Sequence, residues 1–177
     1  MEGRARVEVP ALGRWVLTPE ARDHFERWMG GLVHEDFVDV RNDRVHFTPP
    51  RKPLSQSRVA LVSTGGIRLR SQPPFDLRKP DGDWSIRPIP GDAAPDDITI
   101  DHSHYNHGDA DDDINCMFPI ERVRELADAG SIGEVAGTFY GMMGFIPNGR
   151  HVSEEAGPEL ATRLRADGVD VVLLTPG

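Results

Sequence analysis

The sequence contains a single cysteine, Cys116, among its 177 residues. One thiol can form neither an intramolecular disulfide nor a thiolate zinc cluster, and such cysteine usage is typical of a reducing compartment. The chain also lacks a run of roughly 18 consecutive apolar residues, and its first residues lack the apolar segment of a secretory signal. We therefore expect a cytoplasmic protein with no membrane segment.

Positive charge and nucleotide-binding signatures are scarce as well. Lys and Arg number 20 against 29 Asp and Glu, so the formal net charge is −9. No segment gathers about five basic residues, and a negative surface is repelled by a phosphate backbone. The G-x-G-x-x-G, Gly-Lys-Ser/Thr and H-E-x-x-H signatures are all missing. We expect no nucleic-acid partner and no bound cofactor.

The chain contains no internal repeat, and its length suits one compact domain. Residues 1–52 are predicted to be an N-terminal leader, and residues 53–177 to form the domain. Within the leader, Thr18 and the proline after it have the pattern of a helix start, which predicts an amphipathic helix over about 18–31. Short alternating runs over 37–47 favour a hairpin.

The rest of the chain alternates apolar runs with helical patterns. Val59–Val62 and Val169–Leu174 are nearly all apolar and short, as strands buried on both faces are. Between them, apolar spacing predicts helices over 119–129 and 153–167. This order predicts an α/β domain with a mainly parallel sheet, helices packed on it and long polar loops at its carboxyl edge.

Residues 71–97 are rich in Pro, Gly and Asp and have little periodicity, so we expect a long loop there, followed by a brief strand at Ile98–Ile100. Cys116 lies in an apolar stretch, which favours a buried structural role over that of a nucleophile.

Two segments carry candidate site chemistry. The Thr64-Gly65-Gly66 turn after the first apolar run can present backbone N–H groups to an anion, with Arg68 and Arg70 adding charge, or it can simply reverse the chain.

The second segment, Asp101–Asp109, combines imidazoles and carboxylates at close spacing. Such groups can bind zinc, iron or manganese, or supply a general base, but the spacing matches no specific template. The alternative is a solvated polar loop. The candidate metal ligands are His102, His104, His107 and Asp109.

Several ordered motifs resemble those of one family: Val59–Arg70, Pro73–Asp76, Asp101–Pro119, Arg122–Leu126, Ile132–Gly133 and Val169–Gly177. This pattern is similar to the selenoprotein B family of glycine, sarcosine and betaine reductases, to which D-proline reductase is related. The resemblance covers about residues 53–177 and leaves residues 1–50 uncovered.

The resemblance implies reductive cleavage of a carbon–nitrogen bond α to a carboxylate, with a selenocysteine as nucleophile and a thiol as reductant. In family members of this kind the selenocysteine directly follows a Thr-Pro-Gly like Thr175-Pro176-Gly177. A selenocysteine codon is also a stop codon, so we expect a chain truncated at that codon; the alternative is a domain that ends at its last strand. Truncation would leave Val171 and Leu173 partly exposed.

The resemblance also assigns substrate-binding candidates, which are Thr64, Gly65, Gly66, His102, His104, Tyr105 and Thr175. It implies a small carboxylate-bearing substrate, with partner reductase subunits or a thioredoxin-like reductant, and a homodimer is a further expectation. A rival hypothesis is a small-ligand or metal-binding module that uses the His102–Asp109 loop, and a third is an inert or partner-dependent remnant.

Overall fold

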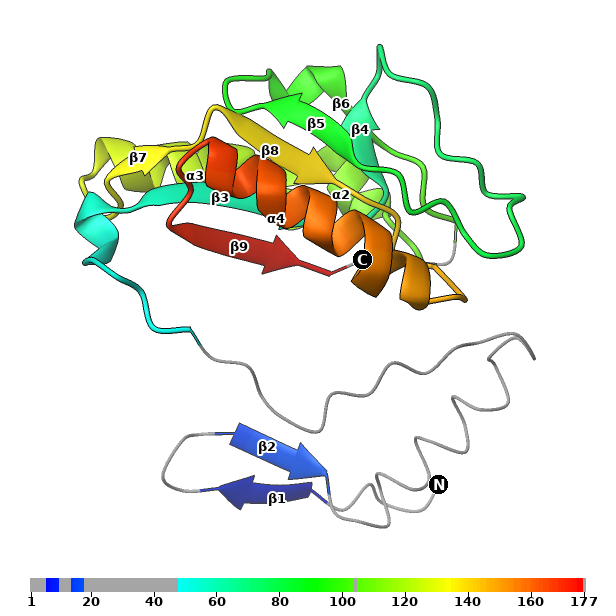
Figure 1. The fold of residues 1–177 in the computed structure, drawn as a ribbon, viewed down its shortest axis with the longest axis horizontal. Helices are drawn as coiled ribbons and strands as arrows, with labels where there is room; N and C mark the ends of the chain where they lie inside the picture. The colour runs from blue at the N-terminus through cyan, green and yellow to red at the C-terminus, as the bar shows by residue number, and fades with distance from the viewer. Residues whose placement is uncertain (1–5, 10–13, 18–47, 104, 177) are drawn as a thin grey trace. The chain divides into compact units, whose positions relative to one another are not determined.

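The computed structural model describes residues 6–9, 14–17, 48–103 and 105–176 (Figure 1). The chain divides into two compact units, Met1–Phe37 and Val38–Gly177. In the first unit, β1 (Arg6–Val9) and β2 (Arg14–Leu17) form an antiparallel hairpin, which the sequence analysis did not predict. The predicted helix over 18–31 and the predicted hairpin over 37–47 lie outside the described residues.

The second unit is an α/β fold built around β3 (Arg58–Ser63), which is almost entirely buried. On one side β3 pairs in parallel with β9 (Val171–Thr175), from Val59 opposite Val171 to Ser63 opposite Thr175. The predicted pair of adjacent parallel strands is therefore confirmed. Among the described strands β9 pairs only with β3, so β3 lies inside the sheet and β9 lies at its edge.

The other side of β3 pairs in parallel with two short consecutive strands, β7 (Glu134–Val135) and β8 (Thr138–Gly141). Beyond them, β5 (Arg87–Pro90) runs antiparallel to β8. The sheet is thus mainly parallel, as predicted.

Helices α3 (Ile120–Asp128) and α4 (Gly157–Ala166) are the two crossovers of this sheet, as predicted. A π-helical turn, η4 (Val152–Ala156), leads directly into α4. The first crossover joins β3 to β7 and β8, and the second returns from β8 to β9 on the other side of β3. Because crossovers are right-handed, this reversal places the helices on opposite faces of the sheet, and Figure 1 shows α4 in front of the strands.

The segment 71–97 differs from the predicted loop because it contains β5. Pro88 and Pro90 lack N–H groups, and two prolines in four residues argue against a central strand. Among the described strands β5 pairs only with β8, and an edge strand of this kind tolerates the two prolines.

The predicted strand at Ile98–Ile100 is confirmed as β6, and it pairs with an unpredicted strand, β4 (Ile67–Leu69). The other helical segments of the described residues are the 3-10 segments η1 (Leu54–Gln56), η2 (Pro95–Asp97) and η3 (Ile114–Cys116), and the short helix α2 (Gly108–Asp112).

The core lies between the sheet and its covering segments. Leu61 of β3, Phe139 of β8 and Phe118 before α3 are fully buried, and the two phenylalanine rings meet edge to face at 6.0 Å between centroids. Ile120 and Val123 give α3 its buried face. None of the described helices is long and apolar enough to cross a membrane.

β9 differs from β3 in its exposure. Leu173 is 42% exposed and Leu174 is 70% exposed, while Val171 is partly buried. The predicted exposure at Val171 and Leu173 is therefore confirmed, and Leu174 adds to it. Apolar side chains left in water on a sheet strand form a surface that a further chain segment or a partner would cover.

Candidate functional site

The carboxyl ends of β3, β8 and β9 meet at one edge of the sheet, which is where ligands bind in open α/β sheets. β5 runs the other way, so it begins at this edge. One row of neighbouring residues crosses the sheet here and consists of Arg87, Gly141, Ser63 and Thr175. We call this the carboxyl edge, and the predicted site residues are placed relative to it.

The Thr64–Gly66 turn follows β3 at the carboxyl edge, and all three of its amides already donate within the chain. Thr64 N donates to Thr175 O at 3.0 Å and Gly66 N to Met142 O at 2.8 Å. Gly65 N donates to Ser63 Oγ at 3.1 Å. The turn therefore presents no amide to an anion, which corrects the anion-binding interpretation.

The two arginines assigned to that anion are occupied too. Arg68 forms a two-bond ion pair with Asp101, and Arg70 Nε donates to Asp96 O at 2.8 Å.

Glycine at positions 65 and 66 lets two other segments approach the turn. Gly66 has a φ of 74°, and a Cβ there would lie 2.9 Å from the backbone nitrogen of His102. A Cβ on Gly65 would lie 2.8 Å from the sulfur of Met117 and 3.2 Å from the hydroxyl of Tyr105. Any side chain at these positions would push the neighbouring segments away.

The structure brings Tyr105 and His102 to the turn. Tyr105 Oη donates to Gly65 O at 2.9 Å, and the rings of His102 and Tyr105 lie 4.6 Å apart between centroids. His102 is 4% exposed. Burial, and to a lesser extent the charge of Asp111, raises the pKa of Tyr105, so its hydroxyl stays protonated and can donate. His104 lies outside the described residues.

Thr175 ends β9 beside the turn, with its carbonyl accepting from Thr64 N. Its Oγ1 is buried and has no hydrogen-bond partner among the described residues, a property it shares only with Arg87 Nε in that part of the chain. Both atoms belong to the row that crosses the carboxyl edge. A buried polar atom without a partner costs free energy, which a ligand that bonds to it would recover.

The remaining metal candidates are directed elsewhere. His107 Nδ1 bonds to Asp111 Oδ2 at 2.8 Å, and its ring meets the edge of Tyr105 at 5.8 Å. Asp109 is exposed in α2, a helix in the segment that we had considered as a loop. Among the described residues, no three His, Cys, Asp or Glu side chains are grouped so that they could hold a metal ion.

Cys116 is exposed, so the prediction of a buried cysteine is wrong. It ends the 3-10 turn η3, which buries Ile114 and is followed by the fully buried Phe118. An apolar sequence context could not show which side of this tight turn would face the core.

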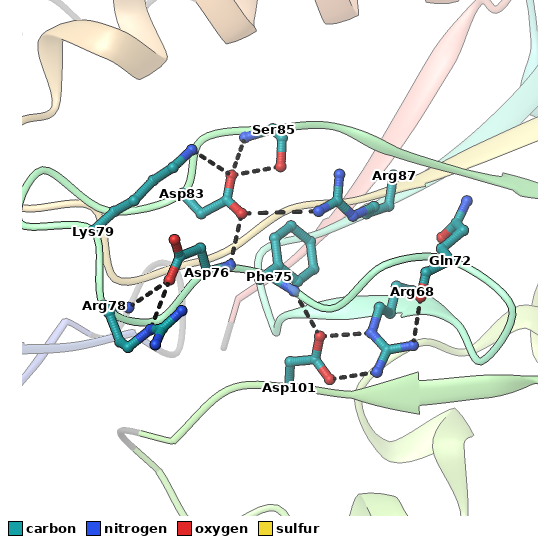
Figure 2. Close-up of polar contacts among 10 residues, drawn as sticks. All are labelled: Arg68, Gln72, Phe75, Asp76, Arg78, Lys79, Asp83, Ser85, Arg87 and Asp101. Atoms are coloured by element: carbon teal, nitrogen blue, oxygen red, sulfur yellow. Dashed lines mark hydrogen bonds and ion pairs between the residues drawn. The ribbon is translucent and has the colours of Figure 1, made fainter.

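Asp83 is a buried carboxylate that the sequence analysis missed, and Figure 2 shows its contacts with Asp76, Lys79, Ser85 and Arg87 in and beside the loop between β4 and β5. It accepts hydrogen bonds from Asp76 N at 2.8 Å and from Ser85 Oγ at 2.5 Å. Burial alone would raise the pKa of Asp83, but the hydrogen bonds from Ser85 and Asp76 outweigh it and lower the pKa. Asp83 therefore stays ionised and fixes the loop beside the carboxyl edge.

The same loop is fastened to the connection that precedes α4. The Trp84 ring stacks on His151 at 3.7 Å between centroids, with 4° between the ring planes. Trp84 Nε1 donates to Glu155 Oε2 at 3.2 Å, and His151 Nδ1 bonds to Glu155 Oε1 at 2.7 Å. Asp81 lies 3.6 Å from His151 Nε2. We call these four residues the Trp84–His151 latch.

A separate groove is lined by residues of β6 and α2. The lining includes Ile98, Ile100 and Ala110, together with the charged residues Arg70 and Asp111. None of the substrate-binding candidates lines it.

Comparison with known proteins gives a consistent family. The sequence profile described as Glycine/sarcosine/betaine reductase selenoprotein B (GRDB) matches residues 34–177. This match begins before residue 53, where the motif resemblance began. No solved structure gives a significant match.

Three similar proteins are subunits of reductases. The chain is 43% identical over 147 residues to "D-proline reductase subunit gamma" of Acetoanaerobium sticklandii, which covers 83% of this chain and 59% of that protein. It is 33% identical over 138 residues to "Glycine reductase complex component B subunit gamma" of Carboxydothermus hydrogenoformans, which covers 75% of this chain and 31% of that protein. It is 30% identical over 140 residues to "Betaine reductase complex component B subunit beta" of Peptoclostridium acidaminophilum, which covers 76% of this chain and 31% of that protein. The chain thus spans less than two thirds of the length of these relatives.

Proposed function

Because this chain belongs to the glycine/sarcosine/betaine reductase selenoprotein B family, we propose that it is the substrate-binding part of a reductase that cleaves a carbon–nitrogen bond α to a carboxylate. The observation that supports this proposal best is the meeting of the Thr64–Gly66 turn, His102, Tyr105 and Thr175 at the carboxyl edge, inside the part of the chain that the family profile matches.

The proposed site binds a small amino-acid derivative through side chains, because the amides of the turn are occupied. Thr175 Oγ1 is the hydroxyl that we assign to the substrate carboxylate, because Tyr105 Oη already donates its proton to Gly65 O. His102 lies against the turn beside Tyr105, and Thr64 and His104 remain proposed members of the site from the family resemblance. Gly65 and Gly66 permit this close packing.

We propose that the nucleophile is a selenocysteine that follows Gly177 in the full reading frame. β9 ends beside the turn, so a residue just past it would lie at the carboxyl edge, where strand-to-helix turns carry reactive groups. The selenolate attacks the α-carbon, a carbon–selenium bond forms, and the amine leaves with the electron pair of the carbon–nitrogen bond. A thiol then attacks selenium to form a selenium–sulfur bond, and the carbon takes the electron pair of the broken carbon–selenium bond and a proton. A second thiol reduces the selenium–sulfur bond, which restores the selenolate and leaves a disulfide.

Partner subunits form a further part of the proposal. The relatives are named as subunits or as components of reductase complexes. The exposed Leu173 and Leu174 offer an apolar strand for a subunit, for a second copy of this chain or for chain beyond Gly177 to cover. A thioredoxin-like protein would supply the thiols.

The test begins with the codon after Gly177 and the frame beyond it. A UGA codon followed by an open frame with an early cysteine and an amphipathic helix supports the proposal, whereas UAA, UAG or UGA without a coding continuation contradicts its nucleophile. The extended protein, with selenocysteine or with cysteine directly after Gly177, should release ammonia or an amine from glycine, sarcosine or betaine, or open the ring of D-proline, in the presence of a dithiol. The 177-residue protein is the matched control and should cleave none of these compounds.

The outcome also separates the proposal from a metal-binding module. Equal amine release by both proteins would assign the chemistry to the His102–Asp109 loop, and stoichiometric zinc, iron or manganese that is lost on His107→Ala would favour the metal module.

A further inference from the structure

We infer that Arg68 and Asp101 form a positioning pair that holds His102 and Tyr105 against the Thr64–Gly66 turn. Neither residue belongs to the substrate-binding candidates. The inference concerns how the site is held in place, and only its last step, on substrate affinity, rests on the proposed function.

Asp101 uses both of its carboxylate oxygens within the chain. Oδ1 accepts from Arg68 Nη2 at 2.9 Å, and Oδ2 accepts from Arg68 Nε at 2.6 Å and from Phe75 N at 2.9 Å (Figure 2). Two parallel bonds between a guanidinium and a carboxylate fix orientation as well as distance. Because both oxygens of Asp101 already bond within the chain, we assign this carboxylate the role of holding other groups in place.

The backbone of Asp101 carries this fixed geometry into the site. Asp101 N donates to Gly66 O at 3.0 Å, and the next residue, His102, places its backbone nitrogen 2.9 Å from where a Gly66 Cβ would be. Four residues after Asp101, Tyr105 Oη donates to Gly65 O. The segment that carries His102 and Tyr105 is therefore tied to the turn at two points, and the ion pair secures the first.

Arg68 also bonds to the backbone that follows it in the chain. Its Nη1 donates to Leu69 O and Gln72 O, both at 3.0 Å, so Arg68 connects this stretch to the segment that carries His102 and Tyr105. The side chains of Arg68 and Asp101 are only 14% and 13% exposed, so removing one charge leaves the other largely buried without its partner. A surface ion pair would not have this consequence.

Asp170 provides a matched control at the opposite edge of the sheet. Its carboxylate also accepts from a backbone amide, Arg58 N at 2.8 Å, and pairs with a basic side chain, Lys52 Nζ at 2.7 Å. Asp101→Asn and Asp170→Asn therefore remove similar interactions, but only the first adjoins the proposed site.

The chain contains two tyrosines, Tyr105 and Tyr140, so ring-labelled tyrosine gives two NMR signals that report on the site and on β8. In the 177-residue protein, we expect Asp101→Asn to shift or broaden the Tyr105 signal and to leave that of Tyr140 in place. Hydrogen exchange of the amide at position 101 should accelerate about ten- to a hundredfold, the usual consequence of losing a charged hydrogen bond. Asp170→Asn should do neither.

An unchanged Tyr105 signal in Asp101→Asn, or the same change in Asp170→Asn, would overturn the inference. Should Asp101→Asn fail to fold, Arg68→Lys retains the charge and removes the two-bond geometry, so it must shift or broaden the Tyr105 signal and leave that of Tyr140 in place.

The last step concerns substrate affinity in the protein expressed from the full reading frame. We expect Asp101→Asn to raise KM about tenfold, as the loss of one well-placed polar contact does, with a smaller change in kcat, and Asp170→Asn to leave KM unchanged. Unchanged KM beside a shifted Tyr105 signal would overturn this step alone. If the unsubstituted protein cleaves no substrate, the proposed function fails while the NMR result still decides the positioning.

Discussion

The two edges of the central sheet carry their polar groups in different ways. At the amino edge, Arg58 pairs with Glu134 at 3.0 Å and with Asp167 at 3.3 Å, and Lys52 pairs with Asp170. Between 24% and 57% of each of these side chains is exposed, so water screens them and each pair contributes little to stability.

At the carboxyl edge the polar groups are buried instead. Asp83 and His102 are 5% and 4% exposed, and Arg87 Nε and Thr175 Oγ1 have no partner among the described residues. Buried polar groups are costly to keep, and those without partners are costlier still. The comparison indicates that water screens the polar groups of the amino edge, whereas those of the carboxyl edge are kept in the interior at a cost in free energy.

The largest expected effect comes from the packing of the carboxyl edge. A Cβ on Gly141 would lie 1.8 Å from the carbonyl oxygen of Ile67, whereas a Cβ on Gly137, nearer the amino edge, would meet only Asp167 at 3.7 Å. Gly141→Ala should lower the free energy of unfolding by about 3 kcal/mol or more, and Gly137→Ala by at most about 0.5 kcal/mol. Urea denaturation measures both, and similar losses would remove this difference between the edges.

Tyr105→Phe should have a moderate effect on stability and a clear one on binding. It removes the hydrogen bond to Gly65 O, which contributes about 1 kcal/mol. In the protein from the full reading frame we expect KM to rise several-fold, because the hydrogen bond that holds Tyr105 against the turn at the proposed site is lost. Urea denaturation measures the loss of stability, and steady-state kinetics measures the change in KM. An unchanged KM would remove Tyr105 from the proposed site.

Thr175→Val should change stability in the opposite direction. It replaces a buried hydroxyl that lacks a described partner by a methyl group of similar size, so the free energy of unfolding should stay equal or rise by up to about 1 kcal/mol. Thr162→Val is the control, because Thr162 Oγ1 donates to Pro158 O on exposed α4 and its loss should slightly destabilise. A clear loss of stability in Thr175→Val would mean that the hydroxyl already has a partner.

The smallest effect is the pH dependence of the Trp84–His151 latch. The hydrogen bond to Glu155, followed by the charges of Glu155 and Asp81, raises the pKa of His151 above its ordinary value of 6.5, and the same bond lowers the pKa of Glu155 below 4.5. Folding therefore favours charged His151, a contribution present below pH 6.5 and lost as the pH rises through the raised pKa. The Glu155 contribution is present above pH 4.5 and lost as the pH falls through the lowered pKa.

The pH range in which both charges stabilise the latch can be measured through the melting temperature. The difference between the unsubstituted protein and His151→Gln should be largest between pH 4.5 and pH 6.5 and should shrink on both sides. A difference that does not vary with pH would show that stacking on Trp84, and not charge, holds the latch.

The fold was predictable where one signal dominates. The apolar runs at Val59 and Val171 gave the parallel pair β3 and β9, and the family resemblance pointed to the turn that follows β3. β5 was missed because Pro88 and Pro90 oppose a strand and only its pairing with β8 overrides them. The exposure of Cys116 depends on the direction of a single 3-10 turn.

The missed site residues share another cause. Asp83 lies in an Asp-Gly-Asp sequence typical of a turn, and nothing local shows that its carboxylate is buried under Asp76 and Ser85. The partners in the latch, Trp84 and Glu155, are 71 residues apart. Arg68 was assigned to an anion because its partner Asp101 is 33 residues away. Contacts of this range depend on the topology and not on the local pattern.

The most direct test of the account is an NMR titration of the ¹⁵N-labelled 177-residue protein with glycine, sarcosine, betaine and D-proline. The account predicts that the largest amide shifts occur at residues 63–66, at His102 and Tyr105, and at Thr175, all at the carboxyl edge. Largest shifts at Arg58, Glu134 and Asp170, or along the groove that Arg70 and Asp111 line, would contradict it.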